Sequence, residues 1–434
     1  MEELKFIKPD EAYATEISAY RKEFLNANIQ ISGSTGLDDY EDPLAWIEHC
    51  RSFEHRATLE NPDLVESDQY MLVRNGDSRI LGLISFRHSL NAYLEEYGGH
   101  IGYSVRPSEQ RKGYAKKMLA LCLRRCLDFG LEKVLITCKA GNEASRRTIL
   151  GAGGVYERNA HLEKDNIDFE RYWIRMDPLK VYYNSYNEEG RLLSKHGMVE
   201  FLTTMRYIER YAKPGMRILE IGAGTGPYSL ALADKGFQVD AVELMENHIE
   251  IFKSKIKEGH RVNIMQANAM DLSMIPDSTY DITLLLGPMY HLYTDSDKRR
   301  ALSEALRVTK SGGVFFTAYC IADASVIQYG FRGGNIPDLF EKKLLDPVTF
   351  RVASRPAEVF ELYRKEDIDK LMEETKGRRL DYVATDLFTN HIRETVDAMD
   401  DETFGIYLNY HFSICGRPDM TGATNHSLDI WRKD

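Results

Sequence analysis

Three glycines at alternate positions, Gly222, Gly224 and Gly226, could bring a ligand close to the main chain. Glycine has no Cβ, so a turn of this composition leaves the backbone open to close approach. The short run Ile218–Ile221 before the turn is typical of a strand buried on both faces of a parallel sheet. Within it, Glu220 places an acidic group near the carboxyl end of the strand, where open α/β sheets bind ligands. This spacing predicts a nucleotide site around the turn.

A second glycine-containing segment, Gln110–Ala115, stands before a helical pattern that runs to Phe129. Backbone N–H groups at the start of a helix form an anion site, and Gly113 and Ala115 would keep the approach to it open. Positive charge surrounds this segment, from Arg111, Lys112, Lys116 and Lys117. A pyrophosphate would suit such a site. The alternative is a basic first turn that binds nothing, although cations there oppose the helix dipole.

Two helical patterns, at 10–26 and 43–56, precede the strand-rich block that holds Gln110–Ala115. The expected strands are Gln69–Val73, Ile80–Arg87, His100–Val105, Val134–Cys138, Gly154–Arg158 and Asp168–Met176. The first two are joined through Asn75-Gly76-Asp77, a strong hairpin signal. A further helix is expected at Asn142–Leu150. The pattern predicts one domain over residues 1–177.

From about residue 190 onward, strands alternate with helical segments, beginning with the amphipathic helix Leu192–Tyr211. The expected strands after the one at 218–221 are Phe237–Val242, Arg261–Gln266, Asp281–Leu286, Val314–Ala318, Leu380–Ala384 and the terminal HSLDIWRK. This alternation predicts a parallel, doubly wound α/β sheet over 191–434. Residues 178–190 are interpreted as a linker, and 321–364 as a long insert over the mouth of the sheet, where such segments commonly close on a substrate.

Composition limits the partners of this 434-residue chain. It carries 56 basic and 67 acidic residues, a net charge of −11, and the acidic excess is shared by both halves. This disfavours a nucleic-acid partner and favours small-molecule acceptors. No apolar run approaches the ~20 residues that cross a bilayer, so we expect no membrane partner. The first residues, MEELKFIKPD, lack the features of a signal peptide, so we expect a cytoplasmic location. Cys122 and Cys126 are expected to pack in a helix, and no metal site is predicted.

The first half resembles the GNAT superfamily of N-acetyltransferases. The family pattern (Gln/Arg)-x-x-Gly-x-(Gly/Ala) stands here as Gln110-x-x-Gly113-x-Ala115. It follows the strand HIGYSVRPSE and precedes NEASRRTILGAGG, at the family's spacing of strand, loop, helix, strand and helix. The resemblance covers about 1–177 and implies a mixed, mostly antiparallel sheet flanked by helices, with acetyl-CoA as the donor.

The resemblance also implies where acetyl-CoA would lie and how the amine would react. Its pyrophosphate would bind the amides of Arg111, Lys112, Gly113, Tyr114 and Ala115, its pantetheine arm would lie along Tyr103, Ser104 and Val105, and Asn142 would face the CoA side. A primary amine would attack the thioester after losing a proton. His100 is the first candidate base and Glu96 the second. Many relatives protonate the thiolate with a tyrosine seven residues after the Asn142 position, where this chain has Ile149.

The second half resembles the class I S-adenosylmethionine (SAM) methyltransferases. Its motif is Glu-x-Gly-x-Gly-x-Gly, and Pro227 occupies the third-glycine position of a dinucleotide fingerprint. The resemblance runs over about 190–434 and implies a Rossmann-like, seven-stranded, doubly wound sheet whose last strand is antiparallel. A NAD-binding or degenerate Rossmann-like domain is the alternative.

By this resemblance, SAM would contact a set of residues at the ends of four strands: Glu220, Gly222, Ala223, Gly224, Gly226, Glu243, Asn268, Ala269, Leu286 and Gly287. Glu243 would accept hydrogen bonds from both ribose hydroxyls, and Asn268 and Ala269 would flank the adenine. Tyr290 and His291 lie where an acceptor could be deprotonated or oriented. The sequence LGPMYH there differs from the (Asp/Asn/Ser)-Pro-Pro-(Tyr/Phe) of relatives that methylate amino groups of DNA bases.

Together these resemblances imply a bifunctional enzyme that acetylates and methylates small amine-bearing molecules. Covalent linkage of the two halves would suit action on one molecule at two points. The alternative is a methyltransferase whose GNAT half is a non-catalytic binding or regulatory module, since Ile149 replaces the expected tyrosine.

Overall fold

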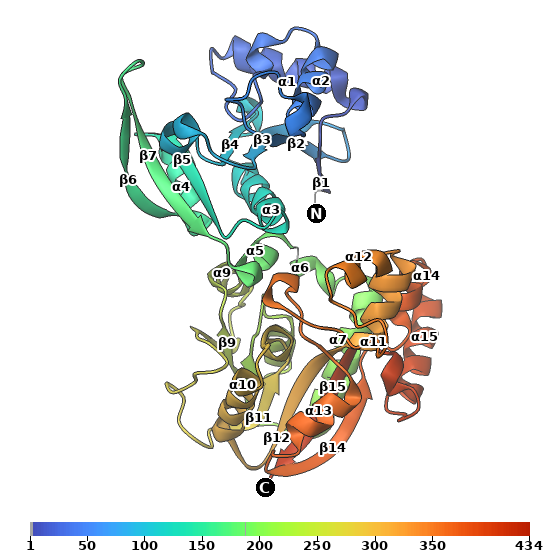
Figure 1. Cartoon of the computed structure of the whole chain (residues 1–434). Coiled ribbons are helices and arrows are strands. Elements are labelled where there is room, and N and C mark those ends of the chain that lie inside the picture. Colours follow the sequence, from blue (N-terminus) through green and yellow to red (C-terminus); the bar gives the residue numbers. More distant parts are fainter. Residues whose placement is uncertain (1–2, 187) are drawn as a thin grey trace. The chain divides into compact units, whose positions relative to one another are not determined.

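The structure, a computed structural model, describes residues 3–186 and 188–434, apart from the side chains of 188 and 189. The chain forms two compact units, Met1–Tyr186 and Asn187–Asp434 (Figure 1). Each unit is an α/β domain with its own sheets and cores, as the sequence predicts. In the described residues, no helix has the length and apolar composition that crossing a bilayer requires.

The first unit contains two antiparallel sheets, β1-β2-β3-β4 and β5-β7-β6. Their strands are β1 (Leu4–Ile7), β2 (Ser67–Arg74), β3 (Ile80–Arg87), β4 (Ile101–Val105), β5 (Lys133–Lys139), β6 (Val155–Leu162) and β7 (Ile167–Arg175). The hairpin expected through Asn75-Gly76-Asp77 is confirmed as the β2–β3 pair. The sheets meet where the His100 N–H donates to the Leu135 carbonyl (2.7 Å). Strands β4 and β5 themselves belong to separate sheets and are not paired with each other.

Helices cover both faces of the four-stranded sheet (Figure 1). These are α1 (Ala14–Asn26) and α2 (Pro43–Ser52) on one face and α3 (Tyr114–Asp128) on the other. Helix α4 (Glu143–Gly151) packs against β5 of the second sheet, and α5 (Pro178–Ser185) packs on α3. Met71 packs toward Trp46 of α2, whereas its neighbour Leu72 packs toward Met118 of α3. Successive strand residues point to opposite faces, so a strand covered on both sides is apolar at nearly every position.

Residues 178–185, expected to belong to a linker, instead form α5. Asp177 caps the helix by accepting hydrogen bonds from the Leu179 and Lys180 N–H groups, and Pro178 occupies its first turn. Val181 is buried in the same core as the apolar face of α3. The eight-residue helix α5 is too short to show a clear periodicity, and its packing on α3 stabilises it.

The second unit is built on a sheet of order β10-β9-β8-β11-β12-β15-β14, with the two-residue β13 paired to β12. The strands are β8 (Arg217–Ile221), β9 (Gln238–Glu243), β10 (Arg261–Gln266), β11 (Tyr280–Leu285), β12 (Thr309–Ile321), β13 (Leu362–Tyr363), β14 (Gly377–Ala384) and β15 (His426–Lys433). Neighbours from β10 to β12 are parallel, and β15 is antiparallel to both β12 and β14. The seven-stranded doubly wound sheet is thus confirmed, and β13 adds a short eighth strand.

Two cores lie on the opposite faces of this sheet. The helices are α6 (Glu188–Arg191), α7 (Lys195–Tyr211), α8 (Pro227–Asp234), α9 (Glu246–Ser254), α10 (Asp295–Val308), α11 (Ala322–Ser325), α12 (Ile336–Glu341), α13 (Lys365–Met372), α14 (Arg393–Asp397) and α15 (Asp401–Ile414). On β8, Ile218 packs with Ile208 of α7, whereas Leu219 packs with Leu302 of α10. The insert expected at 321–364 contains α11, the π-helical turn η7 (Val326–Arg332), α12 and β13.

Candidate active sites

The glycine turn after β8 requires all three of its alternate glycines for backbone reasons. Gly222, Gly224 and Gly226 have φ of 76°, 54° and 83°, in the left-handed region. A Cβ on Gly222 would lie 2.6 Å from Pro288 Cδ, and one on Gly226 would lie 2.5 Å from the Phe252 ring. A Cβ on Gly224 would meet no atom of the described residues within 4 Å. Two of the glycines are therefore needed for packing, and Gly224 faces open space that a ligand can enter.

This difference predicts unequal effects of alanine at two of the glycines. Gly226→Ala adds both a left-handed alanine and a clash with the buried Phe252 ring, so we expect a loss of about 2–4 kcal/mol of unfolding free energy. Gly224→Ala adds the backbone strain alone and should cost about 1–2 kcal/mol. Denaturant unfolding of the two variants measures the difference. Equal losses would contradict the packing assigned to Gly226.

Glu243 ends β9 beside the turn and is a buried, ionised carboxylate. It accepts hydrogen bonds from the Gly224 N–H (2.7 Å) and the Met245 N–H (2.8 Å). Burial opposes its ionisation, but the contacts with His248, Met245 and Gly224 outweigh burial and lower the pKa of Glu243. An ionised carboxylate has lone pairs for more than two donors, so it can also accept from ligand hydroxyls.

Glu220, in contrast, lies under the turn rather than at its surface. It is buried, and it accepts a hydrogen bond from Ser229 Oγ of α8. Burial raises the pKa of Glu220 to about 8, and the negative charge of Glu243 adds to the effect. Ala223 is also buried, and its N–H donates to the Val242 carbonyl (3.0 Å). Glu220 and Ala223 thus support the turn from within.

The segments after β10 and β11 complete the same edge of the sheet. After β10, Asn268 Oδ1 accepts a hydrogen bond from the Met270 N–H (2.9 Å), and Ala269 is buried. After β11, Leu286 is buried, and a Cβ on Gly287 would lie 3.1 Å from the Gly222 carbonyl oxygen. The loops after β8 and β11 therefore touch. The structure places every residue of the expected SAM set at the carboxyl ends of adjacent strands.

Tyr290 and His291 lie in the short 3-10 helix η6 (Pro288–His291) that follows. The Tyr290 hydroxyl donates to the Leu286 carbonyl (2.8 Å). His291 Nδ1 lies 2.9 Å from the Val359 carbonyl oxygen, which can only accept, so Nδ1 carries the proton and the lone pair is on Nε2. Burial lowers the pKa of His291 to about 4. His291 is therefore a neutral imidazole whose orientation the insert fixes.

In the first unit, the backbone turns sharply at the start of α3. Arg111 and Gly113 both have positive φ, 63° and 88°, and Gly113 is the N-cap residue of the helix. A Cβ on Gly113 would meet no atom of the described residues within 4 Å. Lys112 Nζ pairs with Glu109 (2.8 Å), so this cation is partly neutralised by its own neighbour. The turn has the open shape that an anion site requires.

The strand β4 sends its expected pantetheine-lining residues to opposite faces. Tyr103 reaches α4, where its hydroxyl lies 2.8 Å from Ser145 Oγ, whereas Ser104 Oγ lies 3.1 Å from the Tyr20 hydroxyl of α1. This alternation is inherent to a strand. Val105 is half-buried, and its carbonyl accepts a hydrogen bond from Gln110 (3.3 Å). Asn142 caps α4 by accepting from the Ser145 N–H (3.2 Å).

The two candidate bases of the first unit are held in contacts that weaken them as bases. The Leu135 N–H donates to His100 Nδ1 (3.0 Å), so this lone pair is in use, and burial lowers the pKa of His100 to about 4. Glu96 accepts two hydrogen bonds from Arg158 (2.7 and 2.6 Å), and Arg158 lowers its pKa. Ile149 is fully buried in the core, where it packs rather than faces a ligand.

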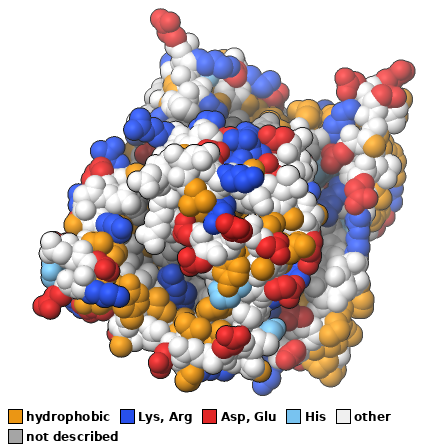
Figure 2. Space-filling view, turned by 90° about the horizontal axis from the view of Figure 1, so that it is seen from above, with side chains coloured by type: hydrophobic (Ala, Val, Ile, Leu, Met, Phe, Trp, Pro, Cys, Tyr) orange, Lys and Arg blue, Asp and Glu red, His pale blue; other side chains and the backbone are white. Residues whose placement is uncertain are grey.

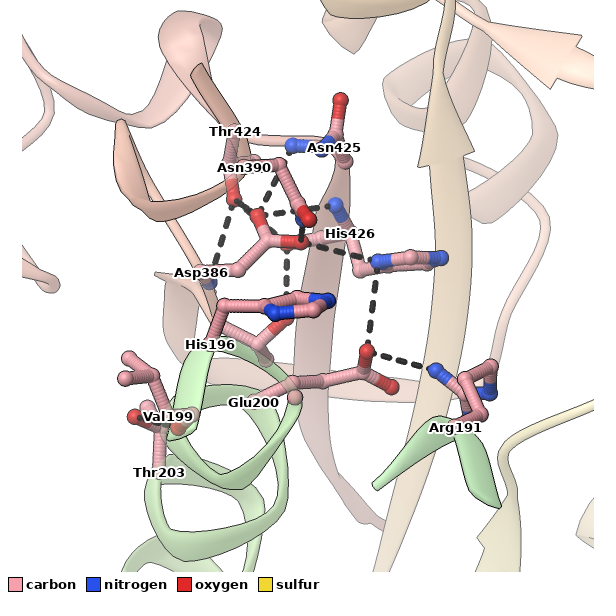
Figure 3. Close-up of polar contacts among 12 residues, drawn as sticks. Arg191, His196, Val199, Glu200, Thr203, Asp386, Asn390, Thr424, Asn425 and His426 are labelled. Carbon is pink, nitrogen blue, oxygen red and sulfur yellow. Dashed lines mark hydrogen bonds and ion pairs between the residues drawn. The ribbon is translucent and has the colours of Figure 1, made fainter. Parts of the chain in front are cut away.

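A polar cluster in the second unit has no counterpart in the sequence motifs. Its members come from three parts of the chain that are far apart: Arg191 and Glu200 from the neighbouring helices α6 and α7, Asp386 from beyond β14, and His426 from β15 (Figure 3). No local spacing could reveal them, because α7, β14 and β15 become neighbours only when the sheet forms. The weak signal available is that Asp386 follows a predicted strand.

On the face that Figure 2 shows, acidic and basic side chains are interspersed and no continuous basic surface is visible. This agrees with the acidic balance of the sequence. A nucleic-acid backbone would need a clustered basic surface.

Comparison with known families matches a domain in each unit. Residues 30–155 match the acetyltransferase (GNAT) domain, and residues 218–313 match the methyltransferase domain. Both resemblances stated from the motifs are thus confirmed. The matched ranges contain the turn at Arg111–Gly113 and the turn at Gly222–Gly226, respectively.

Two methyltransferases are similar to about a third of this chain. A demethylmenaquinone methyltransferase of Clavibacter sepedonicus is 31% identical over 155 residues, which are 36% of this chain and 58% of that protein. A ubiquinone/menaquinone biosynthesis C-methyltransferase of Shewanella sediminis is 31% identical over 157 residues, 35% of this chain and 58% of the other. The chain spans little more than half the length of these relatives.

Among solved structures, a SAM-dependent methyltransferase of Methanosarcina mazei is similar at 18% identity and a TM-score of 0.36, over 52% of this chain and 96% of that one. A score of this size is too low to support a fold assignment. The fold of the second unit rests on its strand order and on the domain match.

Proposed function

We propose that this chain, which carries a GNAT acetyltransferase domain followed by a SAM-dependent methyltransferase domain, is a bifunctional transferase for small amine-bearing molecules. One half would use acetyl-CoA and the other SAM. The observation that supports this most is the open Gly224 beside the ionised Glu243, at the edge where four strands end. The open backbone at Gly224 leaves room for the methionine and ribose portions of SAM, and the Glu243 carboxylate beside it can accept hydrogen bonds from the ribose hydroxyls.

In the methyltransferase half, catalysis would be mainly positional. SAM supplies an electrophilic methyl group, and the protein needs to align the acceptor behind it and exclude water. Glu243 would hold the ribose, Asn268 and Ala269 would flank the adenine, and Leu286 and Gly287 would line the methionine side. Tyr290 and His291, fixed by the Leu286 and Val359 carbonyls, would orient the acceptor under the insert.

In the acetyltransferase half, the amides of Arg111–Ala115 would bind the CoA pyrophosphate, and the pantetheine arm would lie along Tyr103–Val105 of β4, which is not paired with β5. The amine would lose its proton, attack the thioester carbonyl carbon and release the thiolate. The contacts of His100 and Glu96 favour proton loss to water over direct transfer to either side chain.

The alternative is that the GNAT half binds a ligand without catalysis. Three observations favour it: Ile149 packs in the core, His100 Nδ1 is occupied, and Glu96 is held by Arg158. In this alternative the chain is still a methyltransferase, and only the acetyl transfer is absent.

Separate titrations with acetyl-CoA and SAM test the two versions. We expect two independent saturable sites by calorimetry, and gains of both acetyl and methyl mass in an amine panel incubated with both donors. Binding of acetyl-CoA with no acetylated product would support the non-catalytic alternative. If no binding of acetyl-CoA is detected, bifunctionality is excluded. If no binding of SAM is detected, the methyltransferase activity is excluded.

A further inference from the structure

Asp386 and His426 form a hydrogen-bonded pair at the edge of the sheet that also carries the glycine turn. Asp386 stands two residues beyond β14 and is fully buried. His426 is the first residue of β15 and lies directly opposite Cys320, near the end of β12. Because β15 is antiparallel to β12, its first residue lies at the carboxyl ends of the parallel strands.

The carboxylate of Asp386 is fixed by five described donors. Oδ1 accepts from the Thr424 hydroxyl, the Asn425 N–H (2.8 Å) and the His426 N–H (3.2 Å) (Figure 3). Oδ2 accepts from Asn390 Nδ2 (2.8 Å) and contacts His426 Nδ1 at 2.9 Å. These contacts lower the pKa of Asp386 despite burial. A carboxylate held in this way keeps the proton of neutral His426 on Nδ1, so the lone pair is on Nε2. The Cys320 side chain, opposite His426 on β12, also contacts the imidazole.

Other charged groups make this imidazole a stronger base. Glu200 Oε2 lies 3.4 Å from His426 Nδ1, and Arg191 pairs with the same Glu200 oxygen (2.7 Å). Burial opposes a charge on His426, but Glu200, Cys320 and Asp386 together raise its pKa well above the usual value. His411 of α15 faces Asp386, yet burial lowers its pKa to about 4, so it adds no charge. His426 contrasts with His291, whose lowered pKa makes it a weak base.

The pair lies at the same edge of the sheet as the glycine turn. In the sheet, β15 is two places from β11 and three from β8, so strand spacing puts it roughly 10 Å from β11. Asn425, next to His426, anchors the insert: its carbonyl accepts from the Ile321 N–H (2.7 Å), and its side chain accepts from Gln328 (2.8 Å). The pair is thus bounded by the insert and the glycine-turn edge.

The contacts of this cluster fit hydrogen bonds and ion pairs better than a metal site. The ligand atoms of Glu200, Asp386 and His426 lie within 4.8 Å of one another. The Glu200 oxygen, however, already pairs with Arg191, and a cation next to a guanidinium would be repelled. Both Asp386 oxygens also accept hydrogen bonds. The contact between His426 and the two carboxylates needs no ion.

We propose that His426, oriented by Asp386, is the general base that removes the proton of the methyl acceptor. The inference rests on the proposed SAM-dependent activity and names its acceptor class: a molecule whose hydroxyl or amino group is methylated. Nε2 takes the proton of the hydroxyl, or of the ammonium form of the amine, and the lone pair freed in this way bonds to the methyl carbon. The bond from that carbon to sulfur breaks, and its electron pair stays on sulfur. Glu200 positions and strengthens the base.

The test compares His426→Gln with His196→Gln, a matched histidine that also bonds an aspartate (Nδ1 to Asp397, 2.7 Å). SAM affinity is measured by calorimetry, and transfer of labelled methyl from SAM to a panel of phenols and primary amines is measured from pH 6 to 10. We expect His426→Gln to keep SAM affinity, to lose ~10²–10⁴-fold in kcat and to lose the rise of rate with pH. His196→Gln should behave as the wild type.

Glu200→Gln tests the proposal through the pH dependence of the rate, which a purely structural contact would not change. The base must be unprotonated, so the wild-type rate rises as pH passes through the pKa of His426. Removing the Glu200 charge lowers that pKa, and the rise should move to lower pH. An unchanged profile in both the His426 and Glu200 variants overturns the proposal, as does activity that EDTA abolishes and a divalent metal restores. If the wild type binds SAM but methylates no hydroxyl or amine in the panel, the acceptor class is overturned. If it does not bind SAM, the proposed methyltransferase function fails instead.

Discussion

Replacing Glu243 with alanine is expected to weaken SAM binding by roughly 10²–10⁴-fold while leaving acetyl-CoA affinity unchanged. Hydrogen bonds to a charged group contribute about 1.5–3 kcal/mol each, and two ribose hydroxyls would lose them together. The substitution also removes the acceptor that holds the Gly224 and Met245 N–H groups, so the turn loses its fixed position. Calorimetric titration with each ligand measures both affinities.

Two further variants separate binding from general destabilisation. Glu243→Gln retains an oxygen for the Gly224 N–H and should lose less SAM affinity than the alanine variant. Asp240→Ala is the matched control, because Asp240 is a buried acid on the same strand that contacts Arg217 and the Tyr280 hydroxyl (2.9 Å each). It should lower stability without changing SAM affinity. A similar loss of both ligands in Glu243→Ala would contradict the two-site proposal.

The glycine turn could be predicted from sequence because its geometry is encoded locally. Gly222, Gly224 and Gly226 all adopt positive φ, a conformation that glycine reaches at no steric cost. The strands could be predicted for a related reason, since a strand covered on both faces is recognisable as a continuous apolar run. The antiparallel last strand was expected from the family resemblance, and the pairing of β15 with β12 confirms it.

The side-chain chemistry could not be predicted in the same way, because it depends on contacts between distant segments. His100 lies in the expected place, but its Nδ1 accepts from Leu135, 35 residues away. Glu96 is held by Arg158, 62 residues away. Histidine and glutamate are both residue types that act as general bases. Only the structure shows that the side chains of His100 and Glu96 are already held by other groups.

Helix α5 and the Asp386–His426 pair fall outside sequence patterns for the same physical reason. The helix is stabilised by the core that Val181 shares with α3, and the pair forms only when β14 and β15 meet. Neither the packing of α5 on α3 nor the Asp386–His426 pair follows a sequence spacing that could be recognised in advance. Local conformation and periodicity therefore predict the sheets and the ligand turns, whereas proton transfer depends on tertiary contacts.

Gly113→Glu is expected to abolish detectable acetyl-CoA binding while SAM affinity stays unchanged. Gly113 is the N-cap residue of α3, with φ of 88°, and a side chain there would project into the space assigned to the pyrophosphate. A glutamate would fill that space and repel the phosphates at close range. The measurement is calorimetry with acetyl-CoA and with SAM, and the unfolding free energy is recorded in parallel.

The matched control lies just beyond the other end of the same helix. Gly130 has φ of 96°, and a Cβ on it would also meet no atom of the described residues within 4 Å. Gly130→Glu therefore imposes the same kind of backbone strain and adds the same charge, but away from the Arg111–Ala115 turn. If the turn binds the pyrophosphate, Gly113→Glu loses acetyl-CoA and Gly130→Glu retains it, with similar stabilities. If both variants lose acetyl-CoA equally, strain in α3 explains the loss, and the pyrophosphate site must lie elsewhere.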